Sequence, residues 1–133
     1  MKIKNLVFPM VLLFVLVLNV NAQDNKGHDE VFLIVENMPK YPGGEEALRK
    51  DIAEAVKYPE EAKKNKISGK VFVSFVINKE GKVENPKIER GVDSLLDKEA
   101  LRVIKLLKTW TPGTQRGIKV KVQFTLPINF ALD

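Results

Sequence analysis

The chain has 133 residues and a formal net charge of +5, with 22 lysines and arginines against 17 aspartates and glutamates. The lysines are spread along the chain with no adjoining cluster of arginines and aromatic residues, so the charge gives no footprint for nucleic acid. Cysteine is absent, which excludes a disulfide framework, a lipoprotein thioether and thiolate chemistry.

The N-terminal residues have the pattern of an export signal. A short basic start precedes an uninterrupted apolar run at residues 6–18, and small or apolar residues follow up to Ala22. This pattern predicts a secretory signal peptide over residues 1–22 with cleavage after Ala22. The alternative is a short uncleaved anchor, although a membrane-spanning helix needs about 20 apolar residues. We expect a flexible lead-in at 23–35 and one folded domain at 36–133.

The first half of the domain predicts two helices after a short strand. The apolar run at 31–35 is consistent with a strand, and the prolines and glycines at 38–44 interrupt regular structure. An apolar stripe of period 3.6 predicts a helix at 45–56, with acidic residues in its first turn. Pro59 can open a second short helix at 60–65, because its missing N–H costs nothing at that position.

The second half predicts a hairpin, a helix and a long strand. Residues 70–78 carry apolar side chains on both faces, as a central strand does, and a turn with Gly81 leads to a returning strand at 82–90 with a bulge near Pro86. Residues 94–108 predict a helix, opened by Ser94 and Asp97 in a pattern that resembles a capping box. Residues 118–130 then alternate strictly between apolar and polar side chains, and Pro127 indicates a sheet edge.

This order of elements predicts an α+β fold: a two-layer sandwich in which a three-stranded antiparallel sheet carries helices on one face. The residues expected in the core lie on the apolar faces of these elements. They are Val71, Val73, Phe75, Leu96, Val103, Ile104, Leu107, Val120, Val122, Phe124 and Leu126.

The sequence gives no support to catalysis. The single histidine, His28, lies in the lead-in, where no frame holds it near a second group. Adjacent glutamates at 45–46 and 60–61 point about 100° apart on a helix and form no carboxylate dyad. We therefore expect no catalytic residue, no metal site and no cofactor. Trp110 is interpreted as a core residue rather than a ligand contact, and for Tyr58 both roles stay open.

The ordered motifs resemble the TonB C-terminal domain. The first half carries Tyr58-Pro59, then I-x-G-x-V-x-V-x-F at 67–75 and G-x-V at 81–83. The second half carries L-D-K-E-A at 96–100, W-x-P-G at 110–113 and the alternating strand. M-P-x-Y-P-G-G at 38–44 and Q-R-G at 115–117 are similar to versions from the Bacteroidetes. The resemblance covers about residues 36–130.

The resemblance implies a partner rather than a reaction. TonB couples an inner-membrane motor complex to outer-membrane receptors, and its C-terminal domain captures the receptor's TonB box as an added strand on its last strand. It therefore implies a non-catalytic periplasmic module in TonB-dependent transport. The implied partner-binding residues are Val56, Lys57, Tyr58, Pro59, Ile118, Lys119, Val120, Lys121, Val122, Gln123, Phe124, Thr125 and Leu126. The family often has a glutamine near Val56 and Lys57, and this chain has none there.

Three functions stay open at this point. The first is a periplasmic binding module for an extended receptor segment, and the second is an energy transducer anchored in the inner membrane beside its motor complex. The third is a structural domain that pairs weakly with its own copy through the edge strand, or that contacts the cell wall. Full-length TonB carries a long proline-rich spacer. Here only about eight to fifteen residues separate Ala22 from the domain, and they reach at most roughly 30–50 Å when extended. We therefore expect the chain not to transduce energy in the way a full TonB does. The receptor and its nutrient cannot be read from the sequence.

Overall fold

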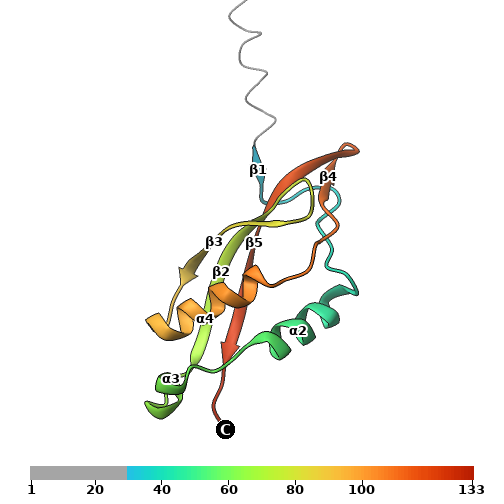
Figure 1. The fold of residues 1–133 in the computed structure, drawn as a ribbon. Coiled ribbons are helices and arrows are strands. Elements are labelled where there is room, and N and C mark those ends of the chain that lie inside the picture. The colour runs from blue at the N-terminus through green and yellow to red at the C-terminus, as the bar shows by residue number, and fades with distance from the viewer. Residues whose placement is uncertain (1–29) are drawn as a thin grey trace, which may run out of the picture. The chain divides into compact units, whose positions relative to one another are not determined.

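A computed structural model describes residues 30–133, so the expected signal peptide and most of the lead-in lie outside the described residues. The chain alternates short helices with strands of very different length (Figure 1). In chain order the elements are β1 (Val31–Phe32), α2 (Gly44–Ala55), α3 (Glu60–Lys64), β2 (Gly69–Ile77), β3 (Val83–Arg90), α4 (Ser94–Lys105), β4 (Gly113–Gln115) and β5 (Ile118–Phe130).

The sheet has five strands instead of the three that were predicted. Its order is β1-β5-β2-β3, and β4 pairs with the start of β5. The three long strands are antiparallel as expected, whereas β1 runs parallel to β5. The α+β class is confirmed. Strand β1 falls within the possible strand at 31–35 but has only two residues, and β4, with three residues, is too short for an alternating pattern to reveal it.

The central position of β2 and the bulge in β3 are both confirmed. Strand β2 pairs with β5 on one side and β3 on the other. Two steps along β2, from Ser74 to Val76, match three steps along β3, from Lys87 to Glu84, and Asn85 between them has φ 48°. This extra residue brings the apolar side chains on both sides of Pro86 against the core.

Helix α4 packs on β2 and β3 with its apolar stripe inward (Figure 1). Its capping differs from the prediction by one residue, because Asp93 is the N-cap and accepts a hydrogen bond from Leu95 N. Asp97 does not close a capping box, because its carboxylate accepts from Val92 N at 3.0 Å. The helix ends at Lys105, earlier than the apolar period at 94–108 suggested.

The core lies between the sheet and the helices. The whole inward face of β2 is buried, together with Trp110 and three residues of β5, namely Val122, Ile128 and Phe130. Phe124 and Leu126 had been expected in the core too, but they are only half-buried and pack against it. Both side chains border a hollow that Leu48 of α2 also lines, whereas Ile128 and Phe130, further along the same strand, are fully covered. Val120 and Leu107 are half-buried as well.

The turn between β2 and β3 positions Trp110. Gly81 has φ 84°, and Trp110 N donates to Gly81 O at 2.8 Å. A Cβ on Gly81 would lie 1.9 Å from Trp110 O, so only glycine permits this approach. The tryptophan ring is thereby fixed between Tyr41, Phe75 and Phe124. Its core position is as predicted, since Trp110 is 5% exposed.

Candidate functional site

The flank of β5 that faces away from β2 is divided into a covered and an open part. Val122 pairs with Ile77 of β2 and with Phe32 of β1, so these two strands lie on opposite sides of β5. Beyond Val122, no described residue pairs with the β1 side of β5. An open edge of backbone donors and acceptors therefore runs from Gln123 to Phe130.

The predicted strand residues thus fall into two groups. Ile118, Lys119 and Val120 pair with β4, and Lys121 and Val122 pair with β1. The remaining four are at the open edge: Gln123, Phe124, Thr125 and Leu126. The β4–β5 hairpin turns through Arg116 and Gly117, both at positive φ, which is the two-residue turn that suits a hairpin.

A hollow of about 370 Å³ lies beside the first half of the open edge. Its strand wall is Phe124 and Leu126, and Leu48 of α2 lies opposite. Aromatic rings line its floor: the Trp110 ring stacks on Phe124 at 5.5 Å, and Tyr41 meets Trp110 edge-on at 5.1 Å. Trp110 Nε1 is buried and has no hydrogen-bond partner among the described residues.

A second hollow, of about 380 Å³, lies beside the other end of the edge. It is walled by Val56 and Tyr58 on one side and by Pro127, Asn129 and Phe130 on the other. The Tyr58 ring meets Phe130 edge-on at 5.7 Å, and its hydroxyl donates to the carbonyl of residue 67. The segment before Pro59 therefore lies beside the end of β5, where the resemblance implied a contact.

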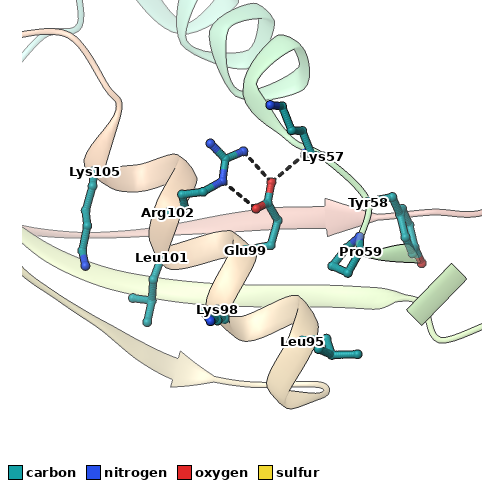
Figure 2. A pocket seen from close by; sticks show the side chains of 9 residues that line it. All are labelled: Lys57, Tyr58, Pro59, Leu95, Lys98, Glu99, Leu101, Arg102 and Lys105. Atoms are coloured by element: carbon teal, nitrogen blue, oxygen red, sulfur yellow. Dashed lines mark hydrogen bonds and ion pairs between the residues drawn. The ribbon is translucent and has the colours of Figure 1, made fainter. Parts of the chain in front are cut away.

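The other two residues of that segment have a different environment. Lys57 and Pro59 line a separate hollow against α4, which Tyr58 also borders (Figure 2). The structure therefore brings Val56 and Tyr58 to the open edge, and it places Lys57 and Pro59 on the α4 side of the same loop.

Helix α2 is held along the edge by a part-buried contact through Tyr41 to the segment after α4. The Tyr41 hydroxyl donates to Asp51 Oδ2 at 2.6 Å and accepts from Lys108 N at 3.2 Å. Burial raises the pKa of Tyr41, and the bond to Asp51 adds to the rise. The Tyr41 hydroxyl in turn lowers the pKa of Asp51, with a further contribution from Lys108. The carboxylate is thus charged near neutral pH and fixes the wall opposite β5.

The loop after α2 is held by a buried carboxylate, which Figure 2 shows. Glu99 of α4 accepts from Lys57 N at 2.6 Å and from Arg102 Nε and Nη2, both at 2.7 Å. Arg102 Nη2 also donates to Ala55 O, the last residue of α2. The bonds from Arg102 lower the pKa of Glu99, with help from Lys57 N. These bonds determine where the chain leaves α2 and hence where Tyr58 lies.

Lys121 is the one predicted strand residue whose side chain is in an ion pair. Its ammonium lies 3.4 Å from Glu84 of β3. A hydrogen bond from Asn78 lowers the pKa of Glu84, and Lys121 contributes to the same shift. The pair is half-exposed and spans the sheet face that carries no helices, so it leaves the open edge unobstructed.

Sequence reasoning missed the wall of the first hollow. Pro39, Leu48 and Trp110 had been assigned to a loop, a helix face and the core, and none was linked to the edge. No local pattern could show that Leu48, 76 positions earlier in the chain, lies opposite Phe124. The pairing of residues 118–120 with β4 was weakly indicated by the Arg116-Gly117 dipeptide. This dipeptide lies between two stretches able to form strands, as a hairpin turn does.

The site has the chemistry of a binding surface. Within residues 30–133 no group of three or more histidine, aspartate or glutamate side chains is placed to hold a metal ion. His28 lies outside the described residues. The same residues contain no helix long and apolar enough to span a bilayer. The open edge and its flanking apolar hollows can hold an extended chain by main-chain hydrogen bonds and alternate side-chain contacts.

The open flank of β5 beside α2 is the kind of sheet edge to which extended peptides add in proteins that bind by strand addition. Residues 54–132 match the family model described as Gram-negative bacterial TonB protein C-terminal. The chain belongs to this family.

Relatives of known name agree with this membership. The chain is 34% identical over 76 residues to protein TonB of Campylobacter coli, a match that covers 56% of this chain and 33% of the relative. It is 33% identical over 84 residues to protein TonB of Haemophilus influenzae, covering 60% of this chain and 31% of the relative. The match thus spans about a third of the length of these relatives.

The fold is similar to that of a solved relative. The NMR solution structure of the Helicobacter pylori TonB C-terminal domain, residues 179–285, superimposes with a TM-score of 0.51 at 28% identity. The match covers 65% of this chain and 78% of that structure. A shorter form of the same domain, residues 194–285, has the same TM-score and identity and is 90% covered.

Proposed function

We propose that this protein is a non-catalytic periplasmic binding module that takes part in TonB-dependent transport. It holds an extended, TonB-box-like segment of an outer-membrane receptor as an additional strand on β5. The observation that carries the proposal is the open edge from Gln123 to Phe130, beside two apolar hollows. Family membership supports the choice of partner.

Main-chain bonding on the open edge can be assigned to particular residues. Pro127 lies in the ladder opposite Phe72, and a proline is tolerated in a ladder where its nitrogen faces the unpaired side. Because bonding direction alternates along a strand, the N–H groups of Gln123, Thr125 and Asn129 also face the open side. Each such bond to a peptide contributes about 0.5–1.5 kcal/mol net.

The hollows favour a particular side-chain pattern in the bound segment. Side chains of an added strand alternate between the two faces, and those on the helix side enter the space under α2. The two hollows are centred near Phe124 and near Phe130, which are separated by roughly 20 Å of extended strand. We therefore expect apolar side chains at alternate positions of the segment, with the largest near its two ends.

Proline substitution at the edge tests this function. Thr125→Pro removes one donor from the open side, whereas Thr125→Ala keeps the backbone, and Thr125 itself is exposed. We expect a TonB-box peptide to bind about three- to tenfold more weakly to the proline variant, and within about twofold of wild type to the alanine variant. Binding is measured by titration with NMR detection, and circular dichroism verifies that both variants are folded.

Two results would contradict the proposal. If both Thr125 variants lose the same peptide affinity, the backbone edge is not part of the binding site. If no TonB-box peptide binds at millimolar concentration, the proposed partner is wrong. The same open edge would also suit pairing with a second copy of the chain, which sedimentation over a range of concentrations detects as a rising mass. An anchored transducer beside a motor complex requires Met1 to be retained, whereas Gln23 at the N-terminus of the exported protein supports cleavage.

A further inference from the structure

An apolar-walled recess lies between α4 and the loop at residues 57–59, away from the open edge, and has a volume of about 490 Å³ (Figure 2). Tyr58, Pro59, Leu95 and Leu101 supply its apolar walls. It is separate from the edge hollows, because it contains no residue of β5. We call it the α4 recess.

Cations surround the α4 recess. Four of its lining residues are basic, namely Lys57, Lys98, Arg102 and Lys105, and a single carboxylate, Glu99, is among them. Glu99 is 9% exposed and already bonded to Arg102 and to Lys57 N, so it offers little to an incoming group. Three positive charges thus remain in excess around an apolar recess.

Two of these cations are available to a partner. Lys98 and Lys105 are exposed and lie two turns apart on α4, and neither forms an ion pair within residues 30–133. By contrast, Lys108, one turn further on, is paired with Asp51 at 3.5 Å. Asp97, next to Lys98, does not line the recess, and its carboxylate accepts from Val92 N. Glu60 and Glu61, which follow the loop at 57–59, do not line it either.

We propose that the α4 recess is a second docking site, which takes an acidic segment of a partner protein that carries a large apolar side chain. The apolar side chain enters between Leu95, Leu101 and Tyr58, and its acidic neighbours pair with Lys98 and Lys105. The inference does not rest on the strand-addition function, because the recess and the open edge are lined by different residues except for Tyr58. Both sites can therefore be occupied together.

A protein segment fits the recess better than a lipid surface does. The apolar groups form the walls of a concavity, and a bilayer surface is too flat to fill it. Peripheral proteins bind a bilayer through apolar side chains that project from the protein surface. Leu95, Leu101, Tyr58 and Pro59 are all half-buried and do not project in this way.

The test uses a fluorescent peptide in which leucines are spaced among glutamates and aspartates, and measures its anisotropy against the purified protein. The double variant Lys98→Glu/Lys105→Glu should weaken binding about tenfold, because two attractive pairs become repulsive. Lys82→Glu/Lys87→Glu is the matched control. It makes the same change of net charge at two exposed positions outside the recess, and should alter binding less than about twofold.

Further arms decide between the occupants. A peptide with leucine replaced by serine should lose most of its affinity, because the recess is then left unfilled. If both double variants weaken peptide binding equally, or if the serine peptide binds as tightly as the leucine peptide, binding is due to general charge attraction. Either result overturns the proposal. Absence of peptide binding overturns it as well, and so does binding of phosphatidylglycerol vesicles in place of the peptide. The Thr125→Pro variant should bind this peptide normally, so failure of one site is distinguishable from failure of the other.

Discussion

Phe124 and Phe75 form a natural matched pair for separating stability from binding. They are register partners on β5 and β2, and their rings stack with centroids 6.4 Å apart. Phe75 is 1% exposed, whereas Phe124 is half-buried, because its ring forms part of the wall of the first edge hollow. The same substitution at the two positions should therefore have different consequences.

The magnitudes follow from these environments. Phe75→Ala leaves a cavity in the core and should reduce the free energy of unfolding by about 3–5 kcal/mol. That is a large part of the 5–15 kcal/mol typical of a domain, so much of the variant should be unfolded. Phe124→Ala loses about half the burial and the ring contacts to Trp110 and Phe75, so we expect a loss of about 1.5–2.5 kcal/mol.

Urea unfolding followed by tryptophan fluorescence measures both variants, because Trp110 is the single tryptophan and stacks on Phe124. Binding of a TonB-box peptide is then measured for Phe124→Ala, with Phe75→Leu as a control that is also destabilised but leaves the hollow intact. Weaker binding is expected for Phe124→Ala alone. If Phe124→Ala lowers stability as much as Phe75→Ala does, Phe124 belongs to the closed core. If Phe124→Ala leaves peptide affinity unchanged, the hollow is not part of the binding site.

Two further predictions concern buried polar groups. Trp110→Phe should cost less than about 1 kcal/mol in urea unfolding followed by circular dichroism, because the lost ring volume is offset by removal of a buried N–H that has no partner within residues 30–133. A loss like that of a core truncation to alanine would refute this. Glu99→Gln should cost about 1–2 kcal/mol at pH 7, because it removes charged hydrogen bonds from Arg102 and Lys57 N. Since the pKa of Glu99 is lowered in the folded state, this stabilisation is complete above the unfolded value of about 4.3 and disappears as the pH falls through the folded value. The melting temperatures of wild type and variant should therefore converge below about pH 4, and a constant difference down to pH 3 contradicts the assignment.

The long elements and the faces they present could be predicted from the sequence. The strict alternation at 118–130 and the two-sided pattern at 70–78 identified β5 and the central strand, because a strand directs alternate side chains to opposite faces whatever lies next to it. The same holds for the apolar stripe of α4 and for the bulge at Pro86, which follow from local geometry. Together these patterns were enough to predict the α+β class.

Which part of β5 is open depends on contacts between distant segments of the chain. A residue's own pattern does not say whether a neighbour occupies its flank, and here that neighbour is the two-residue β1, some 90 positions earlier in the chain. The same non-local packing brings α2 opposite Phe124 and joins Glu99 to Lys57, thereby forming the edge hollows and the α4 recess. Backbone pairing and burial depend on contacts between distant segments, so the sequence could predict the edge strand while the fold set its limits.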